Sequence, residues 1–113
     1  METKATIDPA VFWSCDIRVG HILSAEPLEN ARRPAFVLNI DFGPLGVLKS
    51  TAQLTERYKA DELVGKCIVA VVNLPVKQVG SHQSRCLVLG AVDDQGVHLL
   101  EVPLKSPPGT PVS

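Results

Sequence analysis

The apolar residues of this chain are grouped in short runs, and turn-forming residues separate each run from the next. The clearest run, FVLNIDF (36–42), alternates apolar and polar side chains, which is typical of a strand with one buried face. The turn-forming segment GPLG (43–46) follows it directly. The chain is therefore expected to build its core from short strands. In the first of these runs we expect Phe36, Leu38, Ile40 and Phe42 to point inward, and Asn39 and Asp41 to point outward.

Other apolar runs predict further strands. Within DIRVGHILSA (16–25), Ile17, Val19 and Leu23 are expected on one face, and Gly20 indicates a bend or bulge. A tight hairpin at DDQG (93–96) leads into VHLLEV. The remaining predicted strands cover 47–50, 68–72 and 87–92.

Two segments predict helices. Asp8-Pro9 has the form of a helix N-cap followed by proline at the first helical position, so a short helix is expected through about Cys15. TAQLTERYKADELVG (51–65) is the best helical stretch, and we expect two short helical pieces that end at Gly65.

Five or six short strands with one helical insertion after the third match the plan of an OB-fold. This all-β fold is a five-stranded Greek-key barrel, whose inter-strand loops often bind oligonucleotides. An SH3-like or another small barrel is the alternative, because periodicity does not reveal strand order. We expect one domain, with a helical N-terminal extension (1–15), a barrel (16–101) and a C-terminal extension (102–113). In this plan, residues 73–86 connect the fourth and fifth barrel strands.

Composition argues against several protein classes. No apolar run approaches the roughly 20 residues that span a bilayer, so membrane insertion is not expected. The first thirty residues lack the pattern of a secretory signal. Cys15, Cys67 and Cys86 are odd in number and widely spaced, which argues against a disulfide framework or a zinc site. We therefore expect a cytoplasmic protein without a cofactor.

The formal net charge of −1 conceals an uneven distribution of charged residues. Acids outnumber bases in 1–29, whereas bases outnumber acids in 30–59. The segment NLPVKQVGSHQSRC (73–86) contains Lys77 and Arg85 but no acid. An acid-free loop suits contact with phosphate groups. The alternative is an even scatter of charges over a solvated surface.

Several motifs together resemble the tRNA-binding domain family. They extend in family order over about residues 16–112 and include DIRVG (16–20), ARRPAF (31–36), LNIDFG (38–43) and KSTAQLT (49–55). Members include domains appended to aminoacyl-tRNA synthetases and a bacterial chaperone-like protein. The chain departs from the family pattern in the 73–86 loop. Ser81 occupies the position of a family glycine, and Cys86-Leu87 stands where Gly-Met is usual.

The expected RNA-binding residues lie in three segments. Lys77 and Arg85 are expected to contact phosphates, while amide and hydroxyl groups can bind bases or 2′-hydroxyls. An alternative role for Asn73 is to brace the loop in which it lies. The full set of candidates is Arg32, Arg33, Lys49, Ser50, Asn73, Lys77, Gln78, Ser84 and Arg85.

No catalytic constellation is evident in the sequence. His82 and Cys86 lie in one loop without an acid to orient the histidine, and the three histidines lack metal-site spacing. We therefore expect a non-catalytic protein that binds tRNA or another structured RNA. The resemblance also implies a homodimer and a chaperone role in protein export, with preproteins or export machinery as partners. The competing hypothesis is a peptide-binding chaperone dimer with vestigial RNA binding, whose groove lies near Phe12 and Trp13.

Overall fold

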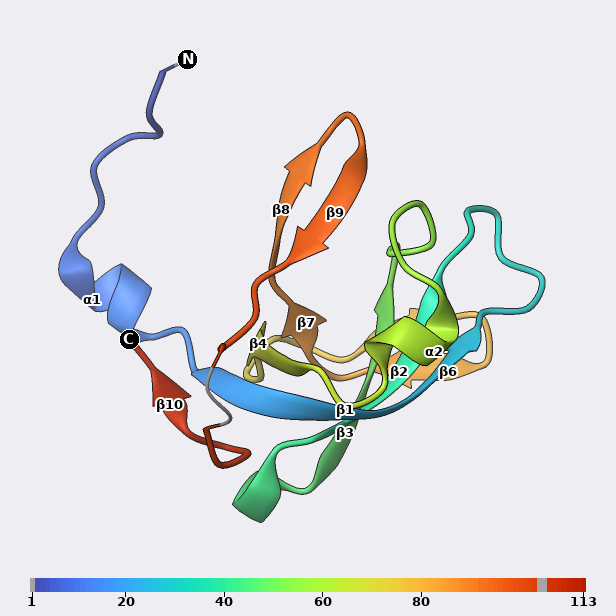
Figure 1. The fold of residues 1–113 in the computed structure, drawn as a ribbon. Helices are drawn as coiled ribbons and strands as arrows, with labels where there is room; N and C mark the ends of the chain where they lie inside the picture. The colour runs from blue at the N-terminus through green and yellow to red at the C-terminus, as the bar shows by residue number, and fades with distance from the viewer. Residues whose placement is uncertain (1, 104–105) are drawn as a thin grey trace.

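The computed structural model describes residues 2–103 and 106–113, and its central feature is a curved antiparallel sheet (Figure 1). The sheet order is β3-β2-β1-β4-β7, with β10 added to β1. The elements are α1 (Pro9–Trp13), β1 (Ile17–Pro27), β2 (Phe36–Asp41), the 3₁₀ helix η1 (Gly43–Leu45), β3 (Val47–Ala52), α2 (Ala60–Leu63), β4 (Cys67–Val71), β5 (Lys77–Val79), β6 (His82–Ser84), β7 (Leu87–Val88), β8 (Gly90–Asp93), β9 (Gly96–Leu99) and β10 (Pro111–Val112).

The sheet bends until its two edge strands approach each other. The long strand β1 pairs with β4 through its first half and with β2 through its second half. The backbone N–H of Arg85 donates to the carbonyl of Lys49 at 2.7 Å, and the N–H of Thr51 donates to Ser84 Oγ at 3.1 Å. These bonds join β3 to the segment between β6 and β7. The predicted OB-type all-β barrel is thereby confirmed.

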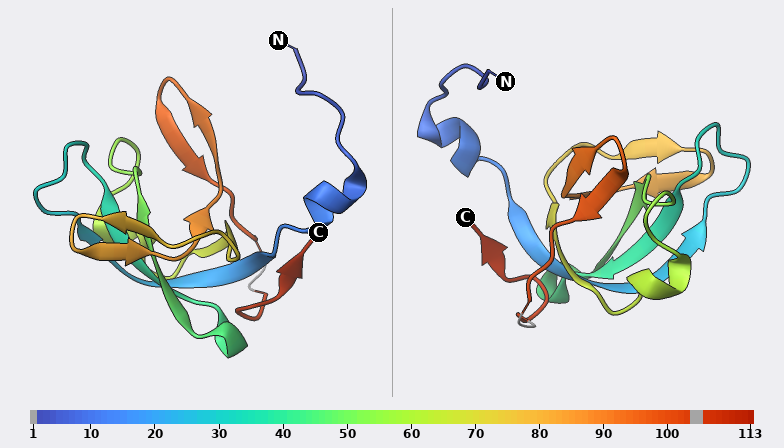
Figure 2. Two further views of the ribbon diagram at one scale, coloured as in Figure 1. Left: turned by 180° about the vertical axis from the view of Figure 1, so that it is seen from behind. Right: turned by 45° about the horizontal axis from the view of Figure 1, so that its top comes forward.

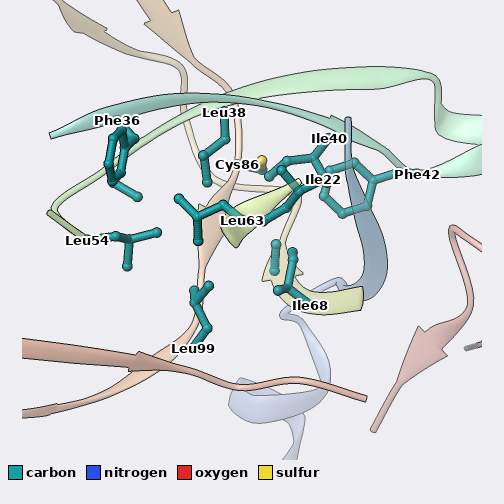
Figure 3. Packing of buried hydrophobic residues seen from close by; sticks show 12 residues of the cluster. Ile22, Phe36, Leu38, Ile40, Phe42, Leu54, Leu63, Ile68, Cys86 and Leu99 are labelled. Atoms are coloured by element: carbon teal, nitrogen blue, oxygen red, sulfur yellow. The ribbon is translucent and has the colours of Figure 1, made fainter. Parts of the chain in front are cut away.

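The core lies inside this barrel, and β2 contributes Phe36, Leu38 and Ile40 to it (Figure 3). The four residues of β2 and its end that were expected to point inward are each at most 6% exposed, so this prediction is confirmed. Ile22, Leu54, Leu63 and Ile68 complete the core from other elements, and none exceeds 1% exposure. Burial of each such side chain stabilises the fold by about 1.5–3 kcal/mol.

The prediction of which β1 side chains share one face was wrong at the centre of the strand. Ile22 is 1% exposed and Leu23 is 50% exposed, because the pairing with β2 shifts register between Ile22 and Ser24. The bulge therefore lies beyond Gly20, which was expected to mark it. Gly20 instead allows close packing, since a Cβ there would lie 2.5 Å from Ile40 Cγ2.

The helical prediction was only partly confirmed. The α1 helix begins where expected, and Asp8 Oδ1 accepts a hydrogen bond from the backbone N–H of Ala10 at 2.9 Å. Between residues 51 and 65, however, the described helix is limited to α2, followed by Gly65 at φ +90°. The first part of this segment continues β3, because Ala52 pairs with Phe36 of β2.

Several strand predictions needed adjustment at their ends. The run at 87–92 divides into β7 and β8, and β8 leaves the barrel to form the predicted hairpin with β9. The strand expected from Val97 ends at Leu99, although Glu101 forms an isolated bridge with Ile68. Residues 77–84, expected to belong to a loop, instead form the β5–β6 hairpin. In the described part of the chain no helix is long and apolar enough to cross a membrane.

Candidate nucleic-acid interface

Two connections of the barrel meet on one side of the molecule. The first loop, residues 28–35 between β1 and β2, lies beside the tip of the β5–β6 hairpin (Figures 1 and 2). Between them is a hollow of about 500 Å³, lined by Arg32 and Arg33 from the loop and by Val79 and Gly80 from the hairpin. We refer to residues 28–35 and 77–85, together with Lys49, as the loop surface.

Lys49 lies in β3 and contacts both the β5–β6 hairpin and the residue that follows it. Its Nζ lies 3.3 Å from Nδ1 of His82, and its carbonyl accepts the hydrogen bond from Arg85 described above. An ammonium group can only donate, so Nδ1 accepts and Nε2 of the neutral imidazole carries the proton. His82 thus presents a donor to the loop surface. Sequence reasoning considered this residue only as a catalytic base and missed its position beside Lys49.

The cations of the hairpin are exposed. Lys77 begins β5 opposite Ser84, and Arg85 follows β6. Arg85 Nη2 donates to Gln83 Oε1 at 3.0 Å, and Gln78 Nε2 donates to the carbonyl of Gly80 at 2.8 Å. Within residues 2–103 and 106–113, the close contacts between a basic side chain and a carboxylate join Arg18 to Asp16, Lys66 to Glu101 and His98 to Asp93. The five cations of the loop surface take part in none of these pairs.

Two acids lie in or beside the loop surface, and one of them, Glu29 of the first loop, also lines the first hollow together with Arg32 and Arg33. Glu26 and Glu29 line a second hollow of about 510 Å³, whose other wall includes Gly80 and His82.

Three of the expected RNA-binding side chains are buried or bonded to residues outside the loop surface. Asn73 Oδ1 accepts from the N–H of Asp16 at 2.9 Å, and its Nδ2 donates to the carbonyl of Ser14 at 2.8 Å. Ser84 is 9% exposed and its hydroxyl accepts the bond from β3 noted above. Ser50 is completely buried. Asn73 and Ser84 thus brace the chain by contacts across the fold, whereas Ser50 has no exposed surface to offer a ligand.

An apolar patch lies at the opposite end of the molecule, on α1. Phe12 and Trp13 are 43% and 62% exposed, with ring centroids 4.9 Å apart in a T-shaped arrangement. Ile7 and Val11 beside them are also exposed, and α1 buries no residue. Figures 1 and 2 show α1 well separated from the loop surface.

Cys86 is 5% exposed, and burial raises the pKa of its thiol to about 11. The thiol is therefore protonated at neutral pH and is a poor nucleophile. No cluster of three or more potential metal-binding side chains occurs in the described part of the chain.

The chain is similar to proteins of known family. The family model "Putative tRNA binding domain" matches residues 17–111. The chaperone CsaA from Bacillus anthracis is 44% identical, with a TM-score of 0.91 over 96% of this chain and 100% of that one. CsaA from Picrophilus torridus is 41% identical, with a TM-score of 0.89 over the same shares. Methionine–tRNA ligase of Leptospira biflexa is 34% identical over 83% of this chain, but this match covers only 14% of the ligase.

Proposed function

Since this chain belongs to the tRNA-binding domain family, we propose that it binds tRNA or similarly folded RNA through the loop surface. The observation that carries the proposal is a set of five cations, four of them exposed and Lys49 half-buried, that form no ion pair within the described residues. They are contributed by the first loop, by β3 and by the hairpin. The set consists of Arg32, Arg33, Lys49, Lys77 and Arg85.

These cations would bind the RNA backbone. Lysine and arginine contacts with phosphates supply affinity and fix orientation, and they carry no sequence information by themselves. Segments 28–35 and 77–85 contain no Phe, Tyr or Trp, so the stacking platforms that grip a flexible single strand are missing from them. This composition favours recognition of a folded RNA by its shape and its phosphates.

The polar candidates divide into two roles in this proposal. Gln78 and His82 lie in the hairpin and present amide and imidazole groups to the RNA. Asn73 and Ser84 act indirectly, because their side chains hold parts of the chain in position, and the buried Ser50 does not contact the RNA. The protein would act without catalysis, in the cytoplasm, where tRNA is present.

The proposal is tested by anisotropy of a labelled tRNA titrated with the protein at 50 mM and then at 200 mM salt. Binding through several phosphates should weaken steeply between the two conditions, because added salt opposes the release of counterions. An absence of binding at 50 mM salt would contradict the proposal.

A second candidate function rests on the exposed apolar patch of α1. We propose that Phe12 and Trp13 join two copies of the chain in a homodimer and provide an apolar groove for extended peptides. The similarity to CsaA chaperones supports this reading, and preproteins or export machinery would then be partners. Two loop surfaces in one dimer would also raise the effective affinity for RNA. Peptide capture by apolar contacts should change little with salt, which separates it from RNA binding.

A further inference from the structure

A small hollow lies at the base of the β5–β6 hairpin, away from the tip that meets the first loop. Its volume is about 130 Å³, and most of its lining is contributed by apolar residues on two segments that flank the hairpin. The residues that matter here are Leu74, Pro75, Lys77, Arg85, Cys86 and Leu87.

Leu74, Pro75, Cys86 and Leu87 form the apolar, uncharged part of this hollow. Leu74 and Leu87 are 46% and 49% exposed, so part of each side chain remains available to a ligand. Cys86 contributes to the lining and is 5% exposed. Burial raises the pKa of its thiol to about 11, which means that it carries no negative charge at neutral pH. Segment 73–86 contains no acid, so nothing in it repels an anion.

Lys77 and Arg85 line the same hollow and are both exposed. An apolar cavity whose lining includes two cations matches the chemistry of a nucleotide, in which an aromatic base lies next to anionic phosphates. We propose that this hollow receives one unpaired base of the bound RNA while Lys77 and Arg85 bind the adjacent phosphates. This inference deepens the proposed RNA binding and depends on it.

The two cations that line the hollow favour an RNA base with its phosphates over the other possible occupants. An apolar peptide side chain would gain nothing from the two cations, and a second copy of the chain would need to bring acids to them. The hydroxyl of Ser84, which also lines the hollow, is already engaged with the N–H of Thr51. Few polar groups are thus free to read base edges, and we expect shape and apolar contact to hold the base with little sequence preference.

The test compares two RNA hairpins that share one stem and carry all their phosphates. One has an intact unpaired loop, and the other has abasic residues throughout the loop. Wild-type protein should bind the intact loop about tenfold more tightly, in line with the usual contribution of one bound base to the affinity. Leu87→Ala should reduce this preference to about twofold without changing affinity for the abasic RNA. Leu45→Ala is the matched control, because Leu45 is 44% exposed in η1, and it should retain the preference.

Leu74→Ala provides a second variant on the opposite wall and should reproduce the effect of Leu87→Ala. Equal wild-type affinity for the two hairpins would overturn the base pocket while leaving the proposed RNA binding intact. Failure to bind either hairpin at 50 mM salt would overturn both. If Leu87→Ala changed the oligomeric state and kept the preference, the hollow would belong to a contact between copies, and the inference would be wrong.

Discussion

Asn73 fastens the N-terminal extension to the barrel by two hydrogen bonds on opposite sides of its amide. Its Oδ1 accepts from the backbone N–H of Asp16 at 2.9 Å, and its Nδ2 donates to the carbonyl of Ser14 at 2.8 Å. The residue stands directly after β4, where the chain turns toward the hairpin. Its amide therefore fixes both the start of β1 and the entry into the 73–86 segment.

Asn73→Ala should lower the free energy of unfolding by about 1–3 kcal/mol, because both backbone groups lose their partner. Asn73→Asp keeps the acceptor for Asp16 but loses the donor for Ser14, so its effect should be smaller. Urea denaturation measures both. If Asn73 braces the chain and does not touch RNA, tRNA affinity should change by less than about threefold in folded Asn73→Ala. A loss comparable to that of a hairpin cation, with unchanged stability, would contradict this role.

Gly20→Ala should destabilise the barrel by about 1–3 kcal/mol through overpacking. The new Cβ would lie 2.5 Å from Ile40 Cγ2 and 2.6 Å from Phe42 Cε1. The cost should be smaller in an Ile40→Ala background, where one of the two clashes is removed. Denaturation of the two single variants and the double variant checks this. Strictly additive effects would show that the close approach does not limit the residue at position 20.

Sequence pattern was sufficient to predict the core face of β2 but not that of β1. In β2, the alternation from Leu38 to Phe42 matches the pleat of one uninterrupted strand, although Val37 on the other face is also buried. In β1 the alternation fails at adjacent Ile22 and Leu23, and only the pairing with β2 reveals the register shift that buries the first and exposes the second. A prediction from alternation with a period of two assumes regular strand pairing, so it fails where the strand contains a bulge.

The candidate site was predictable as a segment but not residue by residue. The acid-free composition of 73–86 identified the hairpin cations. The distinction between ligand-facing and bracing side chains depends on contacts across the fold. Asn73 bonds to residues 57 and 59 positions away, and Ser84 bonds to Thr51, 33 positions away. No local pattern carries such information.

The raised pKa of the Cys86 thiol predicts that the stability of the fold decreases at high pH. Its pKa rises from 9.0 to about 11 on folding, so the folded state holds the proton more tightly. The stability that this tighter proton binding contributes is complete below pH 9.0 and is lost as the pH rises through about 11. The free energy of unfolding of wild type should therefore fall by about 2 kcal/mol relative to Cys86→Ala over this window. Denaturation of both proteins in a pH series tests this, and a constant difference would contradict it.

The apolar patch of α1 predicts a dependence of the oligomeric state on aromatic side chains. Phe12→Ala and Trp13→Ala should convert the proposed dimer into a monomer at micromolar concentration, as measured by light scattering during gel filtration. Val92→Ala is the control, because Val92 is 78% exposed in the β8–β9 hairpin and lies outside α1. A monomeric wild type, or a dimer that survives both aromatic substitutions, would contradict the proposed interface.

The central claim is that RNA binds at the loop surface, and a pair of charge-matched double variants tests it most directly. Lys77→Ala/Arg85→Ala removes one lysine and one arginine from the hairpin, whereas Arg57→Ala/Lys59→Ala removes the same charges from exposed positions outside the loop surface. The measurement is tRNA anisotropy over a salt series. The hairpin variant should lose about tenfold or more in affinity at 50 mM salt and about two units of the salt slope, while the control stays near wild type. Equal losses in the two variants would show that RNA responds only to net charge and would contradict the claim.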